Sequence, residues 1–413
     1  MGNLRFRWRR TGRRAPGTGR GAGRAAAVVA AVALAAVSLG TGPAGHAASG
    51  PAGPYVYYVG DDGGLWSYWQ QTDGSWTTAA VQGGSGVAPA DAPLAASGYP
   101  AGPPTAWTVG SDGALLEDCP ATGKPVAVTK PGFAQPGSYL TATVVAGQPF
   151  VTLPQLPLPA PASGTSPTTP LSVQQVLEIP HPCGPPNVKV ADVFASYAGG
   201  HLASTGLADG GEALFSVDTS GSVRVRWRAP QTGQVTEKQL TAAGTATPGG
   251  GIAVLDTENA GTPAGVVTLF FTGHDGKAYV AHPAEGGGLA DTPQPNKTGP
   301  ATVPDGAELA AAPAKSALRL SWVAADGSVT VATLSAAGVW QRTDAVSDPG
   351  VTAPGSLAGI THLTTGDDVD ICPSYPKFPI RRVGPNPPDP APLSWQDAGP
   401  ALASPGTEMS FAL

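Results

Sequence analysis

A unit of two β-type runs joined by a tight turn recurs along this chain, and it constrains the fold more than any single residue does. Each copy joins its two runs through an Asp-Gly or Ser-Gly pair, and a second turn containing Gly follows. The copies begin near residues 56, 106, 214, 269 and 320. Gly accepts positive φ and Asp tolerates left-handed geometry, so these pairs suit hairpin turns. A repeat of about fifty residues predicts an array of stacked β units.

A short run of small apolar residues precedes most of the units. These runs begin near residues 94, 140, 192, 252, 309 and 357, and a further run ends the chain at Met409–Leu413. Small side chains suit strands that crowd around a central axis. The first unit, from Tyr55, has no such run before it, and the last run has no unit after it. We therefore predict that 409–413 supplies the inner strand of the sheet formed by about 55–80.

Four-stranded units repeated radially, with the chain ends interlocked in one unit, describe a β-propeller. Seven inner strands predict an all-β, seven-bladed β-propeller that is closed by pairing of the C-terminal strand into the first blade. A six-bladed ring with irregular segments and a pair of packed β-sandwiches are the alternatives. Pro-rich stretches near 154–170 and 373–392 are predicted to be loop inserts in a single domain over 55–413.

The first 47 residues predict a secretory signal peptide. Residues 1–24 carry eight Arg and no acid, 25–39 are mostly Ala, Val and Leu, and small residues follow at 45–47. This order of regions marks a secretory signal, and an apolar run of about fifteen residues is shorter than the roughly twenty that span a bilayer. We expect residues 48–54 to be a short linker and the mature protein to be secreted, through either the general or the twin-arginine route.

Removal of the signal peptide leaves an acidic protein. The whole chain has 23 Lys and Arg against 29 Asp and Glu. Without the eight Arg of residues 1–24, fifteen basic side chains remain and the net charge is about −14. Binding to a phosphate backbone depends on Lys and Arg. We therefore expect no nucleic-acid partner, and no membrane association after signal cleavage.

The three cysteines allow at most one intramolecular disulfide. In the repeat register, Cys119 ends the third strand of the second blade, and Cys183 follows the equivalent strand of the third blade. We predict a Cys119–Cys183 disulfide between adjacent blades, with Cys372 left free.

Motifs of catalysis and of metal binding are missing from the sequence. The five His of the mature chain show no HExxH or other paired spacing, and neither a G-x-S-x-G elbow nor a phosphate loop occurs. We therefore expect no cofactor, no metal and no catalytic residues. Carboxylates for glycoside hydrolysis would have to converge from different blades, which a sequence does not show. An extracellular polysaccharide hydrolase or lyase on a propeller scaffold stays an alternative.

Aromatic residues are the strongest candidates for a binding site. A variable column lies six residues after each turn Gly, and three Trp occupy neighbouring strand positions. The column holds Trp69, Cys119, Trp227, His282 and Thr333, and the neighbours are Trp66, Trp107 and Trp322. Aromatic faces stack on the C–H surfaces of sugars. The alternative is that strand indoles fill wedges between blades, and we prefer this interpretation for Trp76, Trp340 and Trp395.

The run Val59-Gly-Asp-Asp-Gly-Gly-Leu-Trp-Ser-Tyr-Trp69, followed by Gly74-Ser-Trp76, resembles the repeat of bacterial and fungal seven-bladed β-propeller lectins of the fucose-binding and tachylectin-like kind. The resemblance covers most of 55–413 and implies sugar pockets between adjacent blades, lined by aromatic and polar side chains. At the matching positions it points to Trp66, Tyr68, Trp69 and Trp76. Other copies carry Leu, Cys or Thr at these positions, so we expect at most one or two sites.

Together these features predict a secreted, lectin-like β-propeller that binds a glycan or cell-surface polysaccharide without catalysis, in aromatic-lined pockets between blades. A protein-interaction scaffold is the third interpretation.

Overall fold

The computed structural model describes residues 55–412 with gaps, of which the longest are 70–76, 155–169, 178–188, 257–266, 351–358, 372–378, 384–393 and 398–408. The chain divides into two compact units, Met1–Ala44 and Gly45–Leu413, and all described residues belong to the second. The predicted signal peptide and linker lie outside the described residues, as does most of both Pro-rich inserts.

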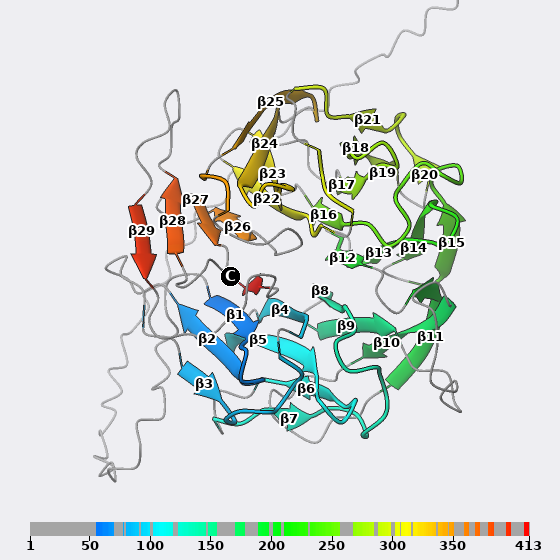
Figure 1. Ribbon diagram of the computed structural model, residues 1–413. Helices are drawn as coiled ribbons and strands as arrows, with labels where there is room; N and C mark the ends of the chain where they lie inside the picture. Colours follow the sequence, from blue (N-terminus) through cyan, green and yellow to red (C-terminus); the bar gives the residue numbers. More distant parts are fainter. Residues whose placement is uncertain are drawn as a thin grey trace, which may run out of the picture. The chain divides into compact units, whose positions relative to one another are not determined.

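Every regular element among the described residues is a β-strand, which confirms the all-β class. These strands form seven four-stranded antiparallel sheets and one two-stranded ribbon in the described part of the chain (Figure 1). We number the four-stranded sheets 1 to 7 in chain order. The described residues contain no helix with the length and hydropathy of a membrane span.

Apart from β30, the strands of sheets 1 to 4 lie between residues 55 and 239. Sheet 1 contains β30 (Met409–Ala412), β1 (Tyr55–Val59), β2 (Leu65–Trp69) and β3 (Ala80–Gln82). Sheet 2 contains β4 (Leu94–Tyr99), β5 (Gly102–Val109), β6 (Leu115–Glu117) and β7 (Val126–Ala127). Sheet 3 contains β8 (Thr141–Val145), β9 (Gln148–Pro154), β10 (Pro170–Leu177) and β11 (Lys189–Tyr197). Sheet 4 contains β12 (Leu202–Gly206), β13 (Glu212–Val217), β14 (Val223–Arg228) and β15 (Val235–Gln239).

Sheets 5 to 7 follow in the second half. Sheet 5 contains β16 (Ile252–Asp256), β17 (Val267–Thr272), β18 (Ala278–Ala281) and β21 (Gln294–Pro295). Sheet 6 contains β22 (Ala310–Ala314), β23 (Ala317–Val323), β24 (Val329–Ser335) and β25 (Trp340–Ala345). Sheet 7 contains β26 (Gly359–His362), β27 (Asp368–Ile371), β28 (Pro379–Val383) and β29 (Ser394–Asp397). The ribbon consists of β19 (Pro283–Ala284) and β20 (Gly288–Leu289).

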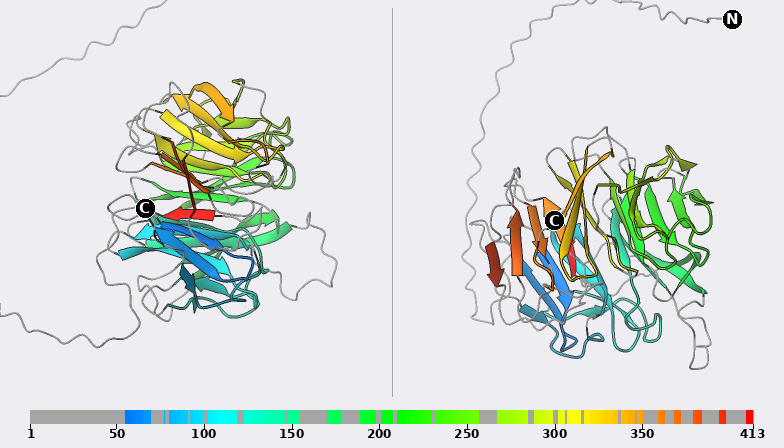
Figure 2. Two further views of the ribbon diagram at one scale, coloured as in Figure 1. Left: turned by 60° about the vertical axis from the view of Figure 1, so that its left-hand side comes forward. Right: turned by 45° about the horizontal axis from the view of Figure 1, so that its top comes forward.

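The first strand of each sheet lies against the first strand of the next sheet. β30 contacts β4, β4 contacts β8, and the contacts continue through β12, β16, β22 and β26, which contacts β30. Figure 1 shows these strands nearest the centre, with the other strands of each sheet following outward. β30 also pairs antiparallel with β1, from Tyr55↔Ala412 to Tyr58↔Met409. The left view of Figure 2 shows β30, in red, beside the blue strands of sheet 1.

One predicted inner strand is in the wrong place. The run near residue 192 belongs to β11, which is the last strand of sheet 3, and the first strand of sheet 4 is β12. An alternating apolar pattern reports that a strand has a buried face, and it does not report the position of that strand within its sheet. The Val- and Phe-containing run of β11 therefore fits an outer strand as well as an inner one.

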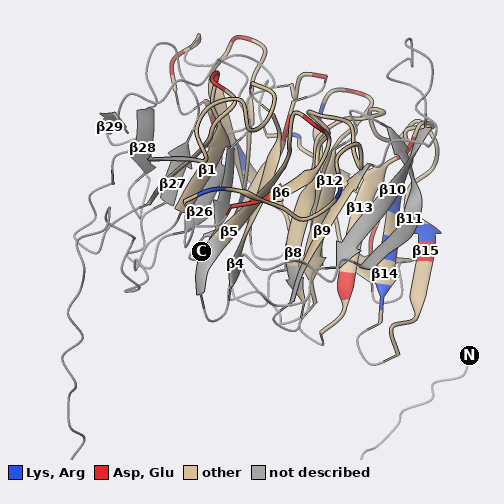
Figure 3. Ribbon diagram, turned by 90° about the horizontal axis from the view of Figure 1, so that it is seen from below, with Lys and Arg blue, Asp and Glu red and all other residues tan. Residues whose placement is uncertain are grey.

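The repeated turns have the geometry that the sequence predicts. At the first turn, Gly63 has a φ of 68°, and the Asp62 carboxylate accepts a hydrogen bond from the Gly64 N–H at 2.8 Å. A Cβ at position 63 would lie 2.3 Å from the carbonyl oxygen of Ala88, so Gly also permits the close approach of the segment that leads to sheet 2. Figure 3 shows acidic residues on several loops along one side of the sheets. The turn glycines of four other copies have positive φ as well: Gly113, Gly221, Gly276 and Gly327.

The apolar core lies between successive sheets. Every residue of β17 is buried. Leu269 and Phe271 belong to a cluster shared with sheet 4, whereas Phe270 belongs to a cluster shared with sheet 6. Because successive side chains of a strand point to opposite faces, one strand fills the wedges on both sides of its sheet.

Candidate functional site

Three of the predicted binding residues pack in these wedges. Trp107 and Trp322 have no exposed area, and Trp227 is 7% exposed. They belong to the clusters between sheets 2 and 3, 5 and 6, and 4 and 5, respectively. The prediction that Trp107 and Trp322 contact a ligand is therefore wrong, because both stand on the second strand of a sheet whose two faces are covered by its neighbours. Both indoles instead fill wedges between sheets, which is the alternative interpretation that the sequence allowed for strand Trp residues.

Trp66 and Trp69 are half-buried residues of β2 that lie on opposite faces of sheet 1. Their positions differ by an odd number, and they pair with Tyr58 and Tyr55, respectively. The Trp66 ring is nearly parallel to that of Tyr58 at a centroid distance of 6.4 Å, and its Nε1 donates to the Asp62 carboxylate at 3.1 Å. The two indoles therefore face different wedges and do not line one pocket.

Trp69 ends a row of three aromatic rings. Its ring lies 5.5 Å from Tyr55, which stacks on Tyr57 at 5.9 Å. Burial raises the pKa of Tyr55 to about 12, and the charge of Asp118 acts in the same direction. Burial also holds the pKa of Tyr57 well above its ordinary value. Both phenols are therefore neutral at physiological pH, and the row reaches the surface at Tyr55 and Trp69.

His282 is held at the boundary between sheets 5 and 6. Its Nδ1 lies 2.6 Å from one carboxylate oxygen of Asp291, and its backbone N–H donates to the other at 3.2 Å. A Cβ at Gly338 of sheet 6 would lie 2.5 Å from the His282 ring. The imidazole therefore contacts the Asp291 carboxylate on one side and packs closely against the turn that precedes β25 on the other.

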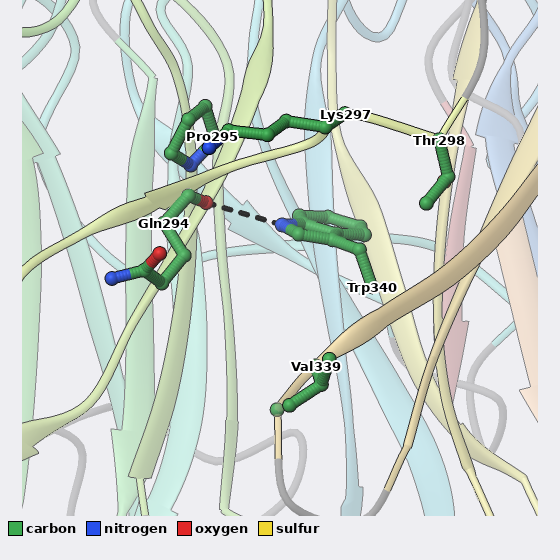
Figure 4. Close-up of a pocket in the computed structure, with 7 residues that line it drawn as sticks. Gln294, Pro295, Lys297, Thr298, Val339 and Trp340 are labelled. Atoms are coloured by element: carbon green, nitrogen blue, oxygen red, sulfur yellow. Dashed lines mark hydrogen bonds between the residues drawn. The ribbon is translucent and has the colours of Figure 1, made fainter.

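The same turn lines a pocket between sheets 5 and 6, with a volume of about 310 Å³ (Figure 4). Sheet 5 and the loop after it supply four of the lining residues, and sheet 6 supplies three. They are Gln294, Pro295, Lys297, Thr298, Gly338, Val339 and Trp340. The Trp340 indole is half-buried, and its Nε1 donates to the carbonyl oxygen of Gln294 at 3.1 Å. Its N–H is therefore used within the protein, and the aromatic surface is what it offers to a ligand.

A ring of hydrogen bonds joins the two sheets beside this pocket. Asn296 Nδ2 donates to Thr343 Oγ1 at 2.8 Å, and Thr298 Oγ1 donates to Asn296 Oδ1 at 2.9 Å. The two Thr hydroxyls lie 3.0 Å apart. Since the Thr298 proton goes to Asn296, the Thr343 hydroxyl donates to Thr298 and closes the ring. Each of the three side chains both donates and accepts a hydrogen bond in this ring, and the network links the two sheets beside the pocket.

A bulge in sheet 6 brings Trp340 into the pocket. Thr343 pairs with Ala332 and Trp340 pairs with Leu334, and the register shifts between Thr333 and Leu334. Residues three apart on a regular strand face opposite ways, whereas the extra residue of a bulge places them on one face. Trp340 therefore faces sheet 5 together with Thr343.

The sequence interpretation of Trp340 as a packing residue is incomplete. Its ring does pack on Phe270, at 6.3 Å between centroids, but it also lines the pocket. Trp340 begins β25, the last strand of its sheet, directly after Val339, which is 63% exposed. The start of an outer strand is therefore where a Trp could have been expected to reach the surface. The bulge that aims the ring has no such signature.

Several predicted positions lie outside what the structure describes. These are Trp76, the side chains of Tyr68 and Trp395, and the three cysteines, including the predicted Cys119–Cys183 pair. Among the described residues, no group of three or more His, Cys, Asp and Glu is arranged to hold a metal ion.

No protein-family model matches the chain, and no curated protein matches it in sequence. Its three-dimensional structure matches the BP39L lectin from Burkholderia pseudomallei with a TM-score of 0.63 and 19% identity, over 86% of this chain and 96% of that chain. The chain is similar in structure to β-propeller lectins. AofleA from Arthrobotrys oligospora matches with a TM-score of 0.49 and 14% identity, over 78% and 89% of the two chains. The lectin from Aleuria aurantia is described as a six-bladed β-propeller with a novel fucose recognition mode. It matches with a TM-score of 0.44 and 16% identity, over 71% of this chain and 95% of that chain.

These matches confirm the resemblance that the repeat predicts. At 19% identity the similarity establishes a shared fold, so the roles of residues rest on the geometry of this chain.

Proposed function

We propose that this chain is a secreted, lectin-like β-propeller that binds carbohydrate without catalysis in the pocket between sheets 5 and 6. The observation that carries the proposal is the half-buried indole of Trp340, which lines the pocket with its N–H already bonded to Gln294. An aromatic surface beside polar groups stacks on the C–H face of a sugar and bonds its hydroxyls.

The size of the pocket suits a terminal sugar. Its volume of about 310 Å³ lies at the lower end of the roughly 300–1,000 Å³ range of small-molecule sites. Trp340 and Pro295 supply apolar surface, and Gln294, Lys297 and Thr298 supply polar atoms. His282, which the sequence predicts as a binding residue, acts by supporting the turn at Gly338.

We further propose that the seven sheets are seven blades of one propeller, closed by β30. The seven four-stranded sheets, the contacts that run from one first strand to the next, and the pairing of β30 with β1 support this arrangement. A six-bladed ring, as described for the Aleuria aurantia lectin, would have to leave one of these sheets outside the ring.

The setting we propose is extracellular. The basic, apolar and small-residue order of residues 1–47 supports secretion. The acidic mature chain supports a glycan or cell-surface polysaccharide as the partner, rather than nucleic acid or a membrane.

A glycan array with the mature protein, residues 48–413, tests this function. We expect binding that falls roughly thirty-fold or more in Trp340→Ala, since truncated aromatic anchors cost this much at binding sites. Trp340→Phe keeps a ring and loses the bond to Gln294, so it should keep most of the affinity.

Trp69→Ala, on sheet 1, is the matched control and should bind normally. Equal glycan binding by Trp340→Ala and the parent protein would rule out this pocket as the site. Release of reducing ends from a polysaccharide would instead indicate an enzyme.

A further inference from the structure

We infer that the pocket between sheets 5 and 6 selects sugars that carry an anionic group, a carboxylate or a sulfate ester, over neutral sugars. This inference rests on the proposed sugar-binding function. Lys297 is the charged side chain among the described residues that line the pocket. It is exposed, and none of the described residues forms an ion pair or a hydrogen bond with its ammonium group.

Most of the other hydrogen-bond donors that line the pocket already donate to acceptors of the protein itself. The Trp340 N–H goes to the Gln294 carbonyl at 3.1 Å, and the Gln294 side-chain amide donates to the Thr292 carbonyl at 2.8 Å. The Thr298 hydroxyl donates to Asn296 at 2.9 Å. Lys297 alone among these lining groups keeps all three of its N–H donors for a ligand. A ligand that matches them must be rich in acceptors.

Two acidic residues beside this boundary are already paired with a described cation or imidazole. Asp291 holds His282 at 2.6 Å, and Asp344 of β25 holds the Arg342 side chain at 3.0 Å. Lys277, on the preceding turn of sheet 5, lies 3.4 Å from Asp275. Lys297 differs from these groups because its charge is not matched by a described carboxylate. In a mature chain with a net charge near −14, such a cation attracts an anionic ligand locally.

The backbone on either side of Lys297 is held by hydrogen bonds. Its neighbours Asn296 and Thr298 both belong to the hydrogen-bond ring that ties sheet 5 to Thr343. Figure 4 shows the Lys297 side chain extending toward Pro295, and Trp340 lines the same pocket. A site whose backbone is held in place loses less entropy when a ligand binds.

The cation and the ring together define the ligand. An acidic sugar can stack its ring on Trp340 while its anionic group accepts hydrogen bonds from Lys297. Hydrogen bonds between charged partners are shorter and stronger than those between neutral ones. A hexuronate or a sulfated hexose meets both requirements, whereas a neutral hexose meets the first.

Isothermal titration of the mature protein tests this selectivity. The probes are methyl glycosides of glucose, galactose and mannose, each paired with its uronate, and galactose 6-sulfate. The members of a pair differ at C6 alone. At low salt, we expect the affinity of each anionic member to exceed that of its neutral partner by about ten-fold or more. This affinity ratio should fall as the salt concentration rises. The sulfate ester shows whether any anion suffices or a carboxylate is required.

Three variants localise the effect. Lys297→Met should reduce the ratio to about one, because it lowers the affinity for the anionic member of each pair far more than the affinity for the neutral member, and Lys297→Arg should keep the preference. Lys277→Met removes a paired lysine of sheet 5 and should change nothing. Equal affinities within each pair in the parent protein, with Trp340→Ala abolishing both, would overturn the selectivity and leave the sugar site standing. No binding of any probe would overturn both.

Discussion

At the scale of single residues, burial and not residue type decides what each Trp does. Trp322 and Trp340 both belong to sheet 6, and both contribute to the wedge facing sheet 5. Trp322 has no exposed area, whereas Trp340 lines the pocket. Residue type alone therefore does not separate a Trp that packs in a wedge from a Trp that lines a pocket.

This difference predicts separable effects of substitution. Trp322→Ala should lower the free energy of unfolding by about 3–5 kcal/mol, because it leaves a large cavity in a wedge. Trp340→Ala should cost much less stability, because its ring is half-buried. Equilibrium denaturation in urea measures both. Equal destabilisation by the two substitutions would contradict this account.

At the scale of the element, the hairpin turn has two structural roles. It reverses the chain with positive φ, and it receives the segment that leads to the next sheet. At Gly63 the incoming Ala88 N–H donates to the Gly63 carbonyl at 2.9 Å. The turn is therefore structural, which explains why it recurs while the positions around it vary.

A pair of glycine substitutions tests the second role, the contact between the turn and the segment that leads to the next sheet. Gly84 has a φ of 83° and open space where a Cβ would stand, whereas Gly63 would place a Cβ 2.3 Å from the Ala88 oxygen. Gly84→Ala should cost about 1 kcal/mol of stability, from backbone strain alone. Gly63→Ala should cost clearly more, since the contact must also open. Matching losses in thermal unfolding would show that the docking contact adds nothing.

At the scale of the whole domain, β30 (Met409–Ala412) connects parts of the chain that are far apart in sequence. β30 supplies the only hydrogen-bonded partner of β1 other than β2 among the described strands. It also contacts β4 of sheet 2 and β26 of sheet 7. We propose that these contacts join the last blade to the first.

Deletion of 409–413 should therefore lower the melting temperature by about 5 °C or more, and it should weaken glycan binding through loss of the folded state. Differential scanning calorimetry of the truncated and the full mature chain measures the shift. Ser410→Ala retains the strand and serves as the control. An unchanged melting temperature in the truncated chain would refute closure by this strand.

Much of the fold could be predicted from the sequence because its signals are local. The positive-φ glycines, the alternating strands on either side of them and the pairing of 409–412 with β1 follow from residue type and spacing. The prediction misplaced the inner strand of sheet 4 because the apolar run of β11 has the pattern expected of an inner strand, although β11 is the last strand of sheet 3. The alternation of apolar residues along a strand does not specify which position the strand takes within its sheet.

The sequence by itself determined an all-β repeat, its turns and its resemblance to propeller lectins, because each of these depends on neighbours along the chain. Tertiary structure alone decided which indoles are buried and where a pocket opens. The pocket depends on a bulge that turns Trp340 toward sheet 5, and on a ring of hydrogen bonds between residues 45 to 47 positions apart. Contacts across two sheets are set by the packing of the wedge between them, and no local signal specifies that packing.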